Sequence, residues 1–183
     1  KYHLVALFTI FVWGFTFVST KVLLVDLSPL WILLLRFVLG LCLLCVMRPH
    51  VLRLKERTDE VLFAAAGATG IAAYYLLENV ALVFTTATAV GVIVAASPLF
   101  TALISAALGD RSSINAHFFC GFALAMAGLI VVGAGTMGEG DIVNFTSFDL
   151  FGDMLALTAA LVWAVYSTLV ARIAQKGYET IVA

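Results

Sequence analysis

Three charged residues, Lys21, Arg36 and Glu78, stand within long apolar runs, Lys21 near the end of its run and the other two further inside. A charge in the hydrocarbon of a bilayer costs about 2.5–3.5 kcal/mol on insertion scales, so it needs a partner or a water-filled cavity. We expect Glu78 to pair with Arg36 or Lys21. Two roles stay open: an ion pair that fixes helix register, or a carboxyl that binds substrate or couples transport to protons, since desolvated carboxyls can titrate near neutral pH. Lys21 alone is more typical of an interfacial anchor.

Aromatic side chains recur at helical spacing around these charges. Tyr74 falls beside Glu78 at an interval of four residues, and Trp13, Phe17 and Lys21 form a similar stripe in the first apolar run. Aromatic walls with a few polar groups suit a small-molecule site. Ordinary helix packing is the alternative for any single ring. The residues that we predict to line a cavity are Trp13, Phe17, Tyr74, Glu78, Asn79, Ser97, Trp163 and Tyr166.

Pro98 interrupts the fourth apolar run near its middle. Proline removes one backbone hydrogen bond, so it should kink this helix and free a carbonyl. The kink could serve substrate contact or a rocking motion, although membrane helices also tolerate proline without any such role. The neighbouring Ser97 is expected to bond back to its own helix, unless it reaches the substrate.

Other chemistry is not indicated. The three cysteines lie in apolar runs, and the Cys42-x-x-Cys45 spacing lacks a second ligand pair, so helix packing explains it better than zinc or redox chemistry. The histidines are scattered, and we expect no metal site and no cofactor. The paired carboxylates or Ser/His dyad of an intramembrane enzyme are missing, so no catalytic residue is expected.

Composition assigns the class of protein. Apolar residues make up 63% of the 183 residues and charged residues 11%, whereas soluble domains average about 45–50% and about 25%. So few charges could not cover a soluble surface, and the expected surrounding partner is a lipid bilayer. A formal net charge of −1 argues against nucleic acid as a partner.

The apolar runs predict an all-α integral membrane protein, because about 20 apolar residues are needed to cross the hydrocarbon core. Short connections join most of them, and two longer polar loops cover 48–60 and 135–149. The six predicted spans are Leu4–Leu24, Leu30–Met47, Val61–Phe84, Ala87–Leu108, Ile114–Ala134 and Phe151–Ile173.

Lysine and arginine counts in the loops set the predicted orientation. Loops on one side hold Asp26, Glu139, Asp141 and Asp149 and no basic residue. Loops on the other side hold Lys1, Arg48, Arg53, Lys55, Arg57, Arg111, Arg172 and Lys176. We therefore expect a cytoplasmic N-terminus.

The sixth span resembles the first at an offset of 150 residues. Ala6-Leu7 aligns with Ala156-Leu157, and Val12-Trp13 aligns with Val162-Trp163. Five spans separate the copies, so the second copy enters from the opposite face, as in the inverted repeats of many transporters. The predicted division is 1–148 for a five-helix repeat and 149–183 for the first helix of a second one. We expect about four more spans in the complete protein, and a few residues ahead of Lys1.

Four short motifs stand out along the chain: Val12-Trp13-Gly14, Glu78-Asn79-Val80-Ala81-Leu82 with Phe84-Thr85-Thr86-Ala87, Ser97-Pro98-Leu99-Phe100-Thr101, and Leu108-Gly109-Asp110. Together they resemble motifs of the drug/metabolite transporter superfamily, specifically its ten-helix EamA-type exporters. Asp110 stands where the family usually has Glu, which keeps the charge.

The resemblance implies a secondary-active carrier of the bacterial inner membrane that exports amino acids or other small organic metabolites by alternating access. The alternatives are an intramembrane enzyme and a non-transporting membrane scaffold. Small residues on one face of the fifth span, Gly121 and Ala125, leave open a contact with another span or with a second subunit, so a homodimer is one expectation.

Overall fold

The computed structural model describes residues 2–47, 54, 56–110, 114–136 and 147–178, and every regular element in these ranges is a helix. The prediction of an all-α fold is confirmed. The basic residues Lys1, Arg48, Arg53, Lys55 and Arg111, and the acidic Glu139 and Asp141, lie outside the described residues. The elements are α1 (Tyr2–Leu23), α2 (Pro29–Met47), α3 (Arg57–Gly67), the π-helix η1 (Ala68–Ala73), α4 (Tyr74–Phe84), α5 (Ala87–Val94), α6 (Ser97–Ala107), α7 (Ala116–Thr136) and α8 (Ser147–Gln175).

Four helical segments are long and apolar enough to cross a membrane: Pro29–Met47, Arg57–Phe84, Ala87–Ala107 and Asp149–Gln175. The first and fifth predicted spans coincide with α1 and α7, whose apolar parts within the described residues are shorter, at Leu7–Leu23 and Ala116–Val131. The chain is therefore a multi-pass membrane protein, and the count of six spans stays a prediction.

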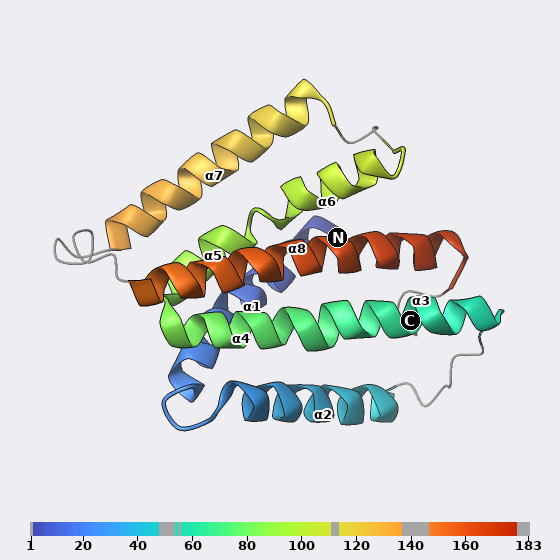
Figure 1. Cartoon of the computed structure of the whole chain (residues 1–183), viewed down its shortest axis with the longest axis horizontal. Coiled ribbons are helices and arrows are strands. Elements are labelled where there is room, and N and C mark those ends of the chain that lie inside the picture. The colour runs from blue at the N-terminus through green and yellow to red at the C-terminus, as the bar shows by residue number, and fades with distance from the viewer. Residues whose placement is uncertain (1, 48–53, 55, 111–113, 137–146, 179–183) are drawn as a thin grey trace.

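The central helix is α8, which lies between α4 and α6 (Figure 1) and contacts α3, η1, α4, α5 and α6. The helices alternate in direction. The ends of α1, α4 and α7 meet the starts of α2, α5 and α8 at one end of the bundle, on the left of Figure 1. We call this the Thr85 end, and the opposite one the Asp59 end, after a buried residue at each.

Two spans depart from regular α-helix. The third passes through η1, where a Cβ on Gly70 would overlap the Tyr166 ring of α8, so only glycine allows this approach. The fourth is divided at Ala95–Ala96 into α5 and α6, and Pro98 lies in the first turn of α6. There its missing N–H leaves no intrahelical bond unmade.

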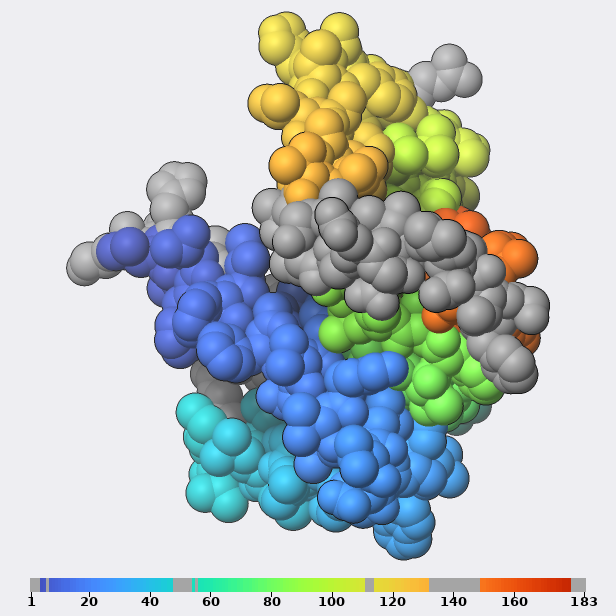
Figure 2. Space-filling view, turned by 90° about the vertical axis from the view of Figure 1, so that its left-hand side faces the viewer, coloured from blue at the N-terminus to red at the C-terminus, as the bar shows by residue number. Residues whose placement is uncertain are grey.

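The core lies where α8 packs against α4 and α5. Ala81, Leu82, Val90 and Ala156 are fully buried there. Along α8 itself, alanines at four-residue spacing are fully buried at Ala156, Ala160 and Ala164, which lets backbones approach closely. Three helices are peripheral: Figure 2 faces the Thr85 end and shows α7 projecting on one side, with α1 and α2 on another.

Candidate functional site

Four of the predicted rings form one cluster, and Trp163 of α8 is its centre. The Trp163 ring centroid lies 5.7 Å from Trp13 of α1, 4.6 Å from Tyr74 of α4 and 5.0 Å from Tyr166 of α8. The Trp13 and Trp163 planes meet at 85°, an edge-to-face arrangement that aromatic pairs favour. Residues from the first, third and sixth predicted spans therefore meet at one place.

The cluster continues along α4 toward α2. Tyr75 lies 4.8 Å from Tyr74 and 5.2 Å from Phe37, centroid to centroid. The Arg36 guanidinium carbon lies 5.3 Å from the centroid of Tyr75, within the range of a cation–π contact. Arg36 Nη2 also donates a 2.6 Å hydrogen bond to Thr20 Oγ1, and Thr20 is fully buried. These two contacts hold the arginine between α1, α2 and α4.

Glu78 is 2% exposed. The Tyr74 side chain hydrogen-bonds its carboxyl, and Arg36 acts on it electrostatically. Among the described residues, the ion pairs within 4.0 Å are those of Lys176, so no basic nitrogen lies that close to Glu78. The pairing of Glu78 with Arg36 or Lys21 therefore stays a prediction, since Arg36 attracts the carboxyl electrostatically but neither cation lies within 4.0 Å of it. Arg36 contacts Thr20 and Tyr75 instead, and Lys21 contacts backbone carbonyls.

Lys21 is part of a polar network at the Thr85 end. Its Nζ donates to the carbonyl of Leu82 and, at 2.8 Å, to that of Thr85, in the last turn of α4. A cation is favourable there because of the negative end of the helix dipole. Thr85 Oγ1 in turn donates a 3.0 Å hydrogen bond to Asp153 Oδ1 of α8. We call Lys21, Thr85 and Asp153 the Thr85 network; it joins α1, α4 and α8.

Asn79 is fully buried on the next face of α4, toward α2. Its Nδ2 donates a 3.2 Å hydrogen bond to the Pro29 carbonyl, while its Oδ1 has no partner in the described part of the chain. An unsatisfied buried acceptor costs about 1–3 kcal/mol. Either a ligand or a water molecule donates a hydrogen bond to such an atom, or the protein bears this cost. Asn79 therefore stays a candidate binding residue.

The remaining predicted residues lie elsewhere. Phe17 packs against the buried core that contains Leu82 and Val90, and the ring contacts found among the described residues do not include it. Ser97 lines a cavity of about 390 Å³ between α6, α7 and α8. Its other lining residues are Pro98, Thr101, Ala102, Ser105, Phe118, Trp163 and Ser167. Trp163 therefore belongs both to this hydroxyl-lined cavity and to the aromatic cluster.

Comparison with known proteins gives this geometry a context. Residues 1–134, well over half of the chain, match the EamA-like transporter family. The chain belongs to this family. It is 27% identical to one "Uncharacterized transporter" of Archaeoglobus fulgidus, over all of this chain and 62% of that protein, and 26% identical to another over 92% of this chain and 56% of that protein. The chain thus spans about three fifths of the length of these relatives. No solved structure matches it.

Family membership and the names of both relatives point to a transporter rather than an enzyme. The resemblance that the sequence motifs suggested is confirmed at the level of the family. The family match covers α1 to α6 and almost all of α7, and it ends before α8 begins. Every ring of the cluster except Trp163 and Tyr166 therefore lies within it.

Sequence reasoning missed a second polar site in this EamA-family chain, at the Asp59 end. Asp59 is 1% exposed and accepts hydrogen bonds from Lys176 Nζ on Oδ1 and from the Tyr178 hydroxyl on Oδ2. The hydrogen bond to Asp59 raises the pKa of Lys176 above its usual value. We call Asp59, Lys176 and Tyr178 the Asp59 network. Its only sequence signal was a carboxylate two residues ahead of an apolar run.

Proposed function

We propose that this EamA-family chain forms part of a secondary-active exporter of small organic metabolites such as amino acids. On this proposal, residues 1–148 are the first inverted repeat, 149–183 begin the second, and the two repeats alternate access to a site between them. The protein lies in a bacterial inner membrane with a cytoplasmic N-terminus, so the Asp59 end faces the cytoplasm.

Contact between the repeated tryptophans supports this arrangement. Trp13 and Trp163 occupy equivalent places in the predicted repeats, 150 residues apart. Their rings pack edge-to-face, with the ring centroids 5.7 Å apart. Equivalent residues meet in this way when they lie close to the axis that relates two inverted repeats, and transporter sites commonly lie at that interface. A ligand there would face aromatic walls from α1, α4 and α8.

Glu78 is the single observation that carries the proposal. A carboxylate that is 2% exposed, inside the apolar span Arg57–Phe84, is costly and needs a reason. The structural alternative is a register-fixing ion pair, and no basic nitrogen lies within 4.0 Å of this carboxyl among the described residues. Electrostatic attraction to Arg36 and a hydrogen bond from Tyr74 keep the carboxyl in place beside the cluster. This arrangement suits a group that exchanges a proton or binds a substrate amine.

Transport assays test the proposal. The full-length protein is reconstituted in liposomes, and uptake and efflux of a panel of amino acids and other small metabolites are measured with and without a pH gradient. We expect at least one compound to be carried, and its flux to respond to the gradient. Absence of transport across a broad panel would count against a carrier and in favour of a membrane scaffold. Turnover of a panel compound in place of its transport would indicate an intramembrane enzyme.

A homodimer through α7 is part of the proposal. Gly121 and Ala125 are exposed on this helix, and a Cβ on Gly121 would meet no atom within 4 Å. Small residues allow two helices to approach closely in a membrane. Chemical crosslinking in native membranes tests this point independently of transport.

A further inference from the structure

The Asp59 network joins two parts of the chain that are far apart in sequence. Lys176 and Tyr178 follow the last residue of α8, whereas Asp59 lies in the first turn of α3, 117 and 119 residues away. The Tyr178 ring packs edge-to-face on Phe63 of α3 at 5.2 Å, and Tyr178 is 7% exposed. Side-chain contacts of the residues directly after α8 thus fasten them across the start of α3.

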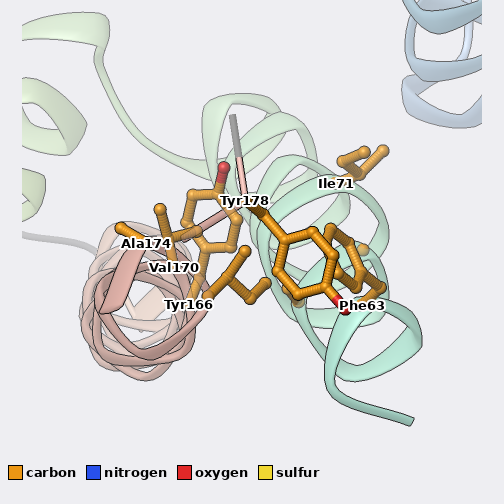
Figure 3. A pocket seen from close by; sticks show the side chains of 9 residues that line it. Phe63, Ile71, Tyr166, Val170, Ala174 and Tyr178 are labelled. Atoms are coloured by element: carbon orange, nitrogen blue, oxygen red, sulfur yellow. The ribbon is translucent and has the colours of Figure 1, made fainter. Parts of the chain in front are cut away.

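A cavity of about 290 Å³ lies beneath this fastening, between α3–η1 and the second half of α8. Figure 3 shows Tyr166, Val170 and Ala174 on the α8 side, Phe63 and Ile71 on the other, and the Tyr178 ring beside Phe63. The other lining residues are Ala66, Gly67 and Ile173. Tyr178 is therefore both a wall of the cavity and a member of the Asp59 network.

The inner wall of the cavity leads to the aromatic cluster. Tyr166 lines the cavity, and its ring lies 5.0 Å from Trp163. The wider backbone of η1 and the missing side chain of Gly70 make room for Tyr166 at this point. Short π-helical segments within α-helices are frequent at functional sites of proteins. The cavity, Tyr166 and Trp163 thus follow one another from the Asp59 end toward the buried carboxyl of Glu78.

We propose that this cavity is the cytoplasmic vestibule of the transport path and that Asp59, Lys176 and Tyr178 form the latch that closes it. The inference rests on the proposed function for its orientation and purpose. The vestibule takes a small, largely apolar or aromatic molecule, because its walls are apolar apart from two tyrosines. In the structure the latch is closed. Opening requires the breaking of two hydrogen bonds to Asp59 and the movement of Tyr178 away from Phe63.

Cysteine accessibility tests the latch. Ala66 lines the cavity and is 6% exposed, so Ala66→Cys reports its opening. All native cysteines of the full-length protein, Cys42, Cys45 and Cys120 among them, are replaced by Ser. A membrane-impermeant maleimide is then added to inside-out vesicles, and the labelling rate is measured against total labelling in denaturant. We expect Tyr178→Phe to raise the rate several-fold and Asp59→Asn to raise it further.

Glu56→Gln is the matched control. Its carboxylate is 3.9 Å from Lys176 Nζ, but its side chain is 68% exposed, so its removal leaves the latch closed and the rate unchanged. Right-side-out vesicles should show no increase for any variant. If Asp59→Asn fails to fold, Tyr178→Phe decides alone, because it removes one hydroxyl and keeps the ion pair.

An unchanged labelling rate in folded Tyr178→Phe and Asp59→Asn overturns the latch, as does an increase seen from the right-side-out face only. The assay uses no substrate. A protein that transports nothing but whose labelling rate responds as expected would therefore refute the proposed function and leave the latch standing. Transport together with an unchanged labelling rate would support the proposed function and refute the latch.

Discussion

The two ends of α8 are held to the first five predicted spans in different ways. At the Thr85 end, Thr85 Oγ1 donates to Asp153 of α8 where Gly152 packs closely on Thr85 and Phe84, and Lys21 of α1 bonds carbonyls at the end of α4. At the Asp59 end, Asp59 accepts hydrogen bonds from Lys176 and Tyr178, and a cavity of about 290 Å³ lies beneath them. Local opening costs the least free energy where the fewest packed apolar contacts must be broken. On the proposal above, the cavity makes the Asp59 end the one that opens, although Ala66, Ile173 and Tyr178 pack there, and the Thr85 end is the joint about which α8 moves.

The substitution Gly152→Ala should destabilise the protein more than the two substitutions discussed after it. A Cβ there would lie 2.8 Å from Thr85 Cβ and 3.0 Å from Phe84 Cβ. Overpacking of this kind costs about 1–3 kcal/mol, and each kcal/mol shifts the melting temperature by about 2–4 °C in a chain of this size. We expect Gly152→Ala to melt several degrees lower in detergent. Gly40→Ala on α2 is the control, because a Cβ there meets nothing within 4 Å. Equal melting temperatures for the two variants would show that the Thr85 end is not tightly packed.

Removal of the Thr85 hydroxyl should have a smaller effect. Thr85 is 5% exposed, and Thr85→Val keeps the shape of the side chain while Asp153 loses its hydrogen-bond donor. We expect a loss of about 1 kcal/mol in the free energy of unfolding, measured by denaturant titration. Thr158→Val on α8 is the matched control, since its hydroxyl is exposed and bonds only the Met154 carbonyl of its own helix. If Thr158→Val lost more free energy of unfolding than Thr85→Val, the Thr85 network would not be what holds α8 at this end.

The smallest effect is expected from Glu56→Gln at the Asp59 end. The side chains of Glu56 and Lys176 are 68% and 41% exposed, so solvent and salt screen their attraction. The melting temperature of the variant should equal that of the wild type. A clear decrease would show that the Asp59 end is held by a wider charge network than the one described.

Much of the fold follows from the sequence. Apolar runs predicted the helices, and helical spacing together with the repeat predicted that Trp13, Tyr74, Trp163 and Tyr166 face a common place; their rings do meet. Whether they bind a substrate stays a prediction. The repeat could not show that α8 lies at the centre of the described helices, because packing order depends on shape complementarity between whole helix faces.

The partners of the charges were less predictable. Lys21 reaches carbonyls 61 and 64 residues away, and backbone acceptors leave no trace in a sequence. Asp153 is the third residue of the sixth predicted span, and nothing in the sequence indicates that it bonds the buried Thr85. Asp59 belongs to the charged loop predicted for 48–60. Charges in such a loop are expected to be exposed to water, so nothing in the sequence indicates that Asp59 is buried. The π-helix at 68–73 has no side-chain signature at all.

Transport by a Glu78→Gln variant tests whether the buried carboxyl takes part in transport. Glutamine keeps the size of the side chain and can still accept a hydrogen bond from Tyr74, but it cannot be ionised. Flux of a carried metabolite through full-length protein in liposomes is compared between the wild type, Glu78→Gln and Glu60→Gln, whose carboxylate is exposed on α3. We expect Glu78→Gln to reduce flux more than tenfold and to abolish its response to a pH gradient, with Glu60→Gln unchanged. Wild-type flux and pH response in folded Glu78→Gln would contradict the account.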